Sequence, residues 1–281
     1  MKFRLRCLDI LSSLFLHVVD PEVFLHLFDT LVDLEASTRL KAGSTLSVKS
    51  DFDAKVKHLV KEVSQFRRGT APKISPDSAS TKDKFVEKLN LLLKDYLKHA
   101  SAQSEVPTLC HILVKVLLAS GKTGGGESED QTLNDSSTDF KSLVNSAFLD
   151  YLDAALATSS KSSSSIGSNL KFEHFSLFES FVSRFQLEVV DESMLKRLED
   201  VVFRKELTTF SRKHLVAIFN QVLGFVCRKE VVDDGEAKVK DIFGRNLKKC
   251  LDAAVEEVGK KETTGQLIQR RAVRNFISVE Q

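Results

Sequence analysis

An acidic pair, Asp233-Asp234, is one candidate for metal chemistry in the sequence. Two neighbouring carboxylates can hold magnesium ions against a nucleoside triphosphate, as on the strand hairpins of nucleotide polymerases. Here Val231 and Val232 are too short a run for a strand, and the flanking residues have helical patterns. An acidic turn before a helix N-terminus explains the pair equally well. We therefore expect no metal site, and a magnesium-dependent nucleotidyl transferase (a DNA polymerase) is the alternative.

The segment Gly121-Lys122-Thr123 is similar to the end of a phosphate-binding loop. The complete motif needs a glycine five residues before Gly121, where this chain has Val116, and it also needs a preceding strand. A helical pattern precedes the segment and a glycine-rich, acidic stretch follows it, so we interpret it as a linker.

The four cysteines stand apart on apolar segments, without a C-x-x-C pairing. This spacing argues against a disulfide framework or a zinc site and fits a reducing compartment. Neighbouring Cys110 and His111 would point about 100° apart on a helix, which is a poor geometry for one metal ion. A nucleophilic Cys-His pair assembled from distant positions stays open. We expect no catalytic residue, no metal and no cofactor. The cysteines are Cys7, Cys110, Cys227 and Cys250.

A basic cluster near the C-terminal end of the sequence is the candidate contact for phosphate or an acidic partner. Its members are Lys260, Lys261, Arg270, Arg271 and Arg274, and the last three fall within about one helical turn. The chain has a net charge of only +2, so any contact with nucleic acid must be local. A solvated helix end is the favoured interpretation of these residues, and the contact is the alternative hypothesis.

The phenylalanines between Phe172 and Phe185 could stack on nucleic-acid bases if basic residues were interleaved with them. Only Lys171 and Arg184 lie close by, and the rings recur at helical spacing. We therefore assign them to a helix core.

The elements that carry these residues are expected to be helices. Of 281 residues, 42% are hydrophobic and 28% are charged, which is typical of a folded protein. Only 4 prolines and 12 glycines are present, and helix-favouring residues dominate. No stretch is long and apolar enough to cross a bilayer, so no membrane contact is predicted.

At the start of the chain, a broad apolar face is predicted to be buried. Its members are Phe3, Cys7, Ile10, Leu11, Leu14, Phe15 and Val18. Asp20 is a good N-cap and Pro21 a good first residue for a second helix, which should run to about Glu35. The short connection between the two helices predicts an antiparallel hairpin.

Later helices are predicted from apolar stripes and from start signals. We expect N-caps at Ser50, with Asp53 in a capping box, at Asp191 and at Ser211. The stripes include Phe85 to Leu97, Pro107 to Gly121, Phe140 to Leu156, Glu236 to Val258 and Thr263 to Phe276.

The helices are predicted to form two repeat halves. We expect a helical half over 1–120, a flexible linker over 121–137, a helix over 138–157, a serine-rich loop over 158–170 and a second helical half over 171–281. About eleven helices in pairs, with a loose period of roughly 50 residues, favour an all-α fold. In this fold, antiparallel helix pairs stack as an irregular HEAT/armadillo-like α-solenoid.

Two segments resemble a known family. The opening Phe3-Arg4-Leu5-Arg6-Cys7-Leu8-Asp9-Ile10-Leu11 and the segment Phe210 to Leu223 are similar to the C-terminal helical part of the DNA polymerase V/Myb-binding protein 1A family. These are packing patterns, and no catalytic residue is carried over with them. The resemblance implies that the chain corresponds to the tail of a longer protein. The acidic tract and strongly basic tail common in the family are absent from the sequence given.

The resemblance implies a function in the nucleus. Members of the family are nucleolar proteins associated with ribosomal RNA gene transcription and ribosome production, and some bind transcription factors. We therefore expect a non-enzymatic nucleolar scaffold with protein partners, pre-ribosomal particles among them, and a local DNA or RNA contact. A cytosolic solenoid adaptor is the alternative from the same architecture.

Overall fold

The computed structural model describes residues 2–40, 48–65, 71–75, 78–101, 104–120, 135–158, 172–202, 207, 209–232 and 244–245. The regular elements in these residues are helices without strands, which confirms the predicted all-α class. Contacts divide the chain into two units, Met1–Tyr151 and Leu152–Gln281, so the boundary falls inside a helix.

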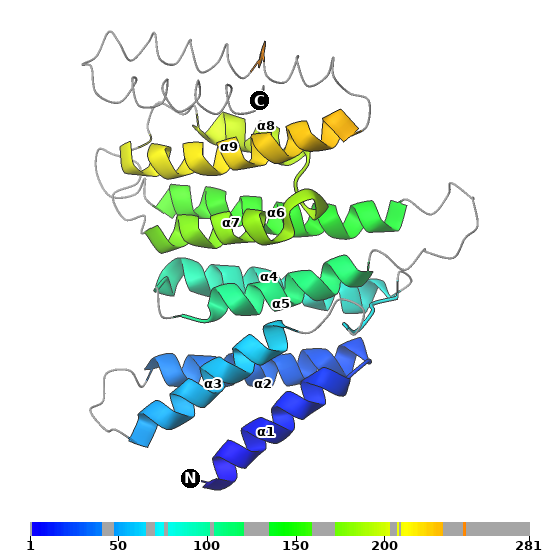
Figure 1. Cartoon of the computed structure of the whole chain (residues 1–281), viewed down its shortest axis with the longest axis vertical. Helices are drawn as coiled ribbons and strands as arrows, with labels where there is room; N and C mark the ends of the chain where they lie inside the picture. Colours follow the sequence, from blue (N-terminus) through cyan, green and yellow to red (C-terminus); the bar gives the residue numbers. More distant parts are fainter. Residues whose placement is uncertain are drawn as a thin grey trace. The chain divides into compact units, whose positions relative to one another are not determined.

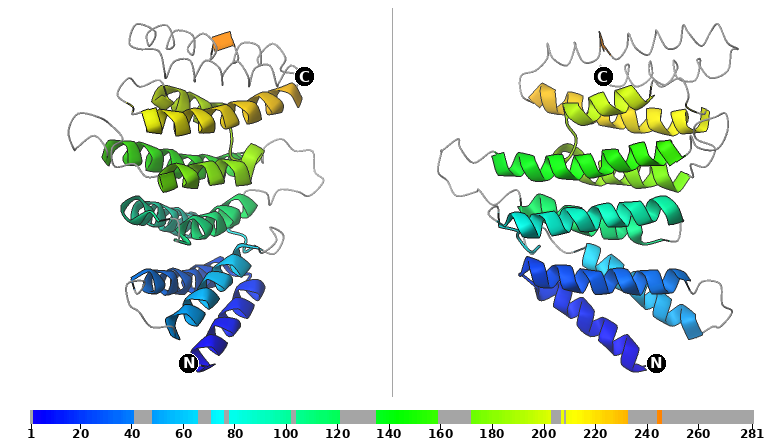
Figure 2. Two further views of the ribbon diagram at one scale, coloured as in Figure 1. Left: turned by 60° about the vertical axis from the view of Figure 1, so that its left-hand side comes forward. Right: turned by 180° about the vertical axis from the view of Figure 1, so that it is seen from behind.

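The first unit contains five complete helices and most of a sixth (Figure 1). They are α1 (Lys2–His17), α2 (Pro21–Leu40), α3 (Val48–Ser64), α4 (Ala79–His99), α5 (Val106–Ser120) and α6 (Asp135–Thr158). Helices α4 and α5 lie side by side as a pair, as the two further views in Figure 2 also show. The helix predicted over 138–157 is confirmed, but it begins three residues earlier, inside the segment assigned to the linker.

The second unit contains the end of α6 and the elements that follow it. These are α7 (Phe172–Phe185), the short 3-10 helix η3 (Gln186–Glu188), α8 (Glu192–Val202) and α9 (Thr209–Val232). Helix α9 packs against both α7 and α8. The phenylalanines of α7 are buried, as predicted, at Phe175, Phe178, Phe181 and Phe185, but Phe172, which was assigned to the same core, is exposed.

Two of the predicted N-caps are confirmed. One carboxylate oxygen of Asp20 accepts hydrogen bonds from the backbone N–H groups of Glu22 (2.8 Å) and Val23 (3.0 Å), which have no partner within the helix. Asp191 accepts in the same way from the N–H of Met194, at 2.9 Å. Val190 and Leu195, on either side of this cap, are both buried and have the spacing of a hydrophobic staple.

The other two predicted starts are wrong. Helix α3 begins at Val48, so Ser50 is a helical residue, and Asp51 already supplies an acidic group in the first turn. Helix α9 begins at Thr209, ahead of Ser211. The rings of Phe210 and His214 pack with centroids 4.7 Å apart, as side chains four residues apart on one helix can. The second helix also extends past Glu35, to Leu40.

Alternate helices in the first unit run parallel. Asp9 of α1 forms an ion pair with Lys55 of α3 (2.7 Å), and Ser12 donates to Glu62 (3.0 Å) further along both helices. In the same sense, α2 and α4 are joined first by Glu22–Lys84 (3.0 Å) and then by Asp29–Lys88 (2.5 Å). Parallel alternate helices are what stacked antiparallel hairpins produce, so these contacts give the register of the α-solenoid.

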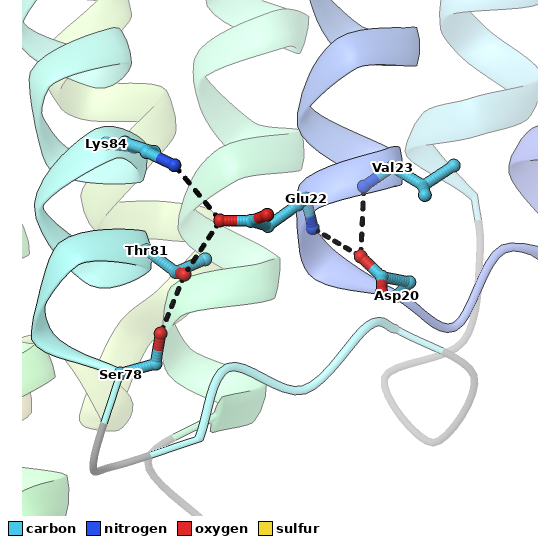
Figure 3. Close-up of polar contacts among 6 residues, drawn as sticks. All are labelled: Asp20, Glu22, Val23, Ser78, Thr81 and Lys84. Atoms are coloured by element: carbon cyan, nitrogen blue, oxygen red, sulfur yellow. Dashed lines mark hydrogen bonds and ion pairs between the residues drawn. The ribbon is translucent and has the colours of Figure 1, made fainter.

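The starts of α2 and α4 are tied together by a small polar network (Figure 3). The carboxylate of Glu22 accepts from the Lys84 ammonium and from the Thr81 hydroxyl (3.4 Å), and Ser78 donates to Thr81 (2.7 Å). The hydrogen bond and positive charge of Lys84 lower the pKa of Glu22. Exposed ion pairs of this kind contribute little free energy, so the network serves mainly to fix the register.

Aromatic packing holds the same two helices together from the inside. Phe24 meets Phe15 edge to face at a centroid distance of 5.5 Å and stacks on Phe28 and Phe85, both at 6.2 Å. Each of the four rings is at most 5% exposed. Buried rings of this size dominate core energetics, so this cluster joins the first helices of the unit to α4.

The connection between α3 and α4 also belongs to the core. Ile74 is buried, and its backbone N–H donates to the hydroxyl of Ser120 at the end of α5 (2.9 Å). The ammonium of Lys115 donates to the last carbonyl of α3, at Ser64 (2.6 Å). A positive charge at a helix C-terminus stabilises it, so this contact supports the packing of α3 on α5.

We predict that Asp20→Ala lowers the free energy of unfolding of the first unit by about 1 kcal/mol, because two N–H groups of α2 lose their acceptor. The chain has 2 tyrosines and no tryptophan, and both Tyr96 and Tyr151 lie in this unit, so tyrosine fluorescence during urea unfolding measures it selectively. Asp20→Asn is the control and should retain most of the stability, since asparagine also caps. Equal losses in the two variants would contradict the capping role.

Candidate functional site

Several of the sites predicted from sequence lie outside the described residues. They are Asp233, Asp234, Lys260, Lys261, Arg270, Arg271 and Arg274, together with Gly121-Lys122-Thr123. The two helices predicted over 236–258 and 263–276 also fall almost wholly outside them.

Cys110 and His111 are both buried in α5. Burial raises the pKa of the Cys110 thiol far above its ordinary value, and burial also raises the pKa of Tyr151 nearby on α6. A neutral thiol enclosed in apolar surroundings is a poor nucleophile. Cys110 is therefore a core residue in this structure.

Among the described residues, no group of three or more His, Cys, Asp or Glu side chains is placed to hold a metal ion. No helix in this part of the chain has the length and apolar character needed to cross a bilayer.

One exposed aromatic cluster lies in the second unit. Phe172, at the start of α7, and Phe210, in the first turn of α9, are about half exposed, and both contact the ring of His214. Phe175 stacks on the same imidazole from the core side, with centroids 5.3 Å apart. Burial, and next the positive charge of Lys213, lower the pKa of His214. The neutral ring is thus favoured in the folded protein.

A larger exposed apolar surface lies on α1. Leu8 and Phe15 face the core, whereas Phe3, Cys7, Ile10 and Leu14 are exposed. We call the latter four residues the α1 seam. At 100° per residue, the seam is centred about 120° around the helix from Leu8 and Phe15. The predicted buried face includes the four seam residues together with Phe15, and for the seam this prediction is wrong.

The large side chains of the seam are about half or more exposed to solvent. Phe3, Ile10 and Leu14 are 78%, 60% and 49% exposed. The side of α1 that carries Asp9 and Ser12 packs on α3 instead. The seam spacing of four, three and four residues was visible in the sequence, but one helix wheel cannot tell which of two apolar faces its neighbours will cover.

Scans against protein-family models, curated proteins and solved structures find no match to this chain.

The burial of Cys110 predicts selective thiol chemistry. In the native protein at pH 7.5, iodoacetamide should label Cys7, which is exposed, and leave Cys110 unlabelled until denaturant is added. Peptide mapping by mass spectrometry measures both sites in one sample. Labelling of Cys110 at the rate of Cys7 without denaturant would contradict its placement in the core.

The aromatic cluster predicts an unusual histidine. In an NMR titration, His214 should have a pKa below the ordinary 6.5, and Phe210→Ala should raise that pKa by exposing the ring to water. Since the folded-state pKa is the lower one, the neutral ring stabilises the fold above about pH 6.5, and this contribution is lost as the pH falls through the folded-state pKa. His214→Gln identifies the resonance, and Phe3→Ala is the control. A pKa at or above 6.5 in the unmodified chain would rule out this account.

Proposed function

We propose that this chain is a non-enzymatic helical scaffold that binds protein or ribonucleoprotein partners in the nucleolus during ribosome production. The observation that carries the scaffold role is the α1 seam, an ordered row of apolar side chains left at the surface of a packed helical unit. Contiguous exposed apolar surface is characteristic of protein interaction sites. Stacked helix pairs serve as binding surfaces in repeat proteins generally.

The nucleolar part of the proposal has a different support. It comes from the similarity of the opening segment and of Phe210 to Leu223 to the DNA polymerase V/Myb-binding protein 1A family. Members of that family are nucleolar proteins associated with ribosomal RNA gene transcription and ribosome production. From this similarity we propose transcription factors and pre-ribosomal particles as the classes of partner. The basic cluster from Lys260 to Arg274 is the proposed contact for nucleic acid or acidic groups.

The proposal predicts where the protein is found and what it binds. A tagged full-length protein should concentrate in nucleoli and co-purify with factors of ribosome production, whereas the tag alone should do neither. Fluorescence imaging and mass spectrometry of the purified material are the measurements. A uniformly cytosolic signal with no nucleolar or pre-ribosomal partner would contradict the nucleolar role and favour a cytosolic adaptor.

The non-enzymatic part is tested separately. Purified protein should not incorporate nucleotides in the presence of magnesium, either before or after Asp233→Asn. Incorporation that this substitution abolishes would overturn the scaffold proposal in favour of a nucleotidyl transferase, because conversion to the amide removes a carboxylate ligand and its charge.

A further inference from the structure

The α1 seam has the spacing of one side of a two-helix coiled coil. Phe3, Cys7, Ile10 and Leu14 follow each other at intervals of four, three and four residues, which are the d, a, d and a positions of successive heptads. All four are exposed in the structure, and the core positions Leu8 and Phe15 lie on a different side of the helix. The seam is therefore available to a second helix without any rearrangement of the first unit.

The charges beside the seam indicate which helix would fit. Arg4 and Arg6 occupy the e and g positions that flank Phe3 and Cys7, and both side chains are exposed. Neither forms an ion pair with another residue in the described part of the chain. Residues at e and g select coiled-coil partners by charge, so carboxylates are the complement of this arrangement.

We propose that the α1 seam binds an amphipathic helix of a partner protein that has apolar residues at heptad spacing and Glu or Asp at the flanking positions. This inference rests on the proposed scaffold function and names the class of partner. The small side chain of Cys7 leaves space opposite it for a larger apolar residue, while Phe3 and Ile10 on either side supply the greater part of the contact.

A second copy of the chain is a poorer occupant of the seam. The e and g positions of the next heptad hold Leu11 and Ser13, so another α1 brings no carboxylate to Arg4 or Arg6. An anionic membrane is also a poorer fit, because interfacial helices present a broad apolar face to the lipid. The seam is narrow, and the roughly opposite side of α1, which carries Asp9 and Ser12, packs on α3.

The test uses the full-length chain and two designed peptides of three heptads each. Both peptides have Leu at a and d, and they differ only in having Glu or Lys at e and g. By fluorescence anisotropy, the acidic peptide should bind at least about tenfold more tightly than the basic one at low salt, and this preference should shrink as salt rises. Equal binding of the two peptides, or no binding of either, would overturn the proposal.

Three variants locate the contact. The double variant Ile10→Glu/Leu14→Glu should abolish binding, whereas Leu16→Glu should leave it unchanged, because Leu16 is equally exposed (52%) but lies about 150° around the helix from the seam. Arg4→Glu/Arg6→Glu should reverse the preference, so that the basic peptide binds more tightly. Circular dichroism and the tyrosine-detected urea midpoint confirm that each variant is folded. Binding of the acidic peptide that survives both double variants would place the contact elsewhere.

The other occupants have distinct outcomes. Sedimentation that shows a dimer, lost in Ile10→Glu/Leu14→Glu, would assign the seam to a second copy instead. Seam-dependent binding to phosphatidylserine vesicles without peptide binding would assign it to a membrane. Either result overturns the proposal. If neither peptide binds selectively but the protein is nucleolar, only the proposed class of partner is rejected. If the acidic peptide binds but the protein is cytosolic, the nucleolar role is rejected and the inference about the α1 seam holds.

Discussion

The burial of apolar helix faces against neighbouring helices is the constraint on which this structure depends. In the first unit it is concentrated at Phe24, whose ring contacts Phe15, Phe28 and Phe85 and so joins α1, α2 and α4. A single amphipathic helix cannot shield its apolar residues from water, and in a two-helix hairpin each helix is covered on only one side. The helices of this unit therefore stack. The ion pairs between α2 and α4 then fix the register of these two helices.

The same constraint explains why α1 keeps an exposed seam. Helices within a stack are covered by neighbours on two sides, whereas the first helix described has its neighbours, α2 and α3, on one side of it. The apolar residues of the α1 seam, on the side without a neighbour, therefore remain exposed to water. Exposed Phe3, Ile10 and Leu14 cost solvation free energy in the isolated chain, and a partner helix would recover it.

Local signals in the sequence were reliable where a residue acts on its own neighbours. Asp20 and Asp191 cap the helices that follow them because the acceptor and the free N–H groups are only two or three residues apart. Ser50 and Ser211 carry the same signal and fail. At α9, the helix begins at Thr209, ahead of the expected cap at Ser211, and Phe210 packs on His214 within its first turns. The buried carboxylate of Glu35 makes a contact that no local signal predicts. It accepts a hydrogen bond from the backbone N–H of Glu105 at the start of α5, 70 residues away.

The sequence by itself determined that the described part of the chain is helical, where most of its helices lie and which residues form most of the core of α7, because these follow from spacing of three to four residues along one segment. The tertiary structure alone decided the parallel register of α1 with α3 and α2 with α4, the burial of Cys110, and the division of the apolar residues of α1 between core and surface. Each of these depends on which helix lies opposite. Periodicity shows that a face is apolar, but only the neighbours determine whether it is covered.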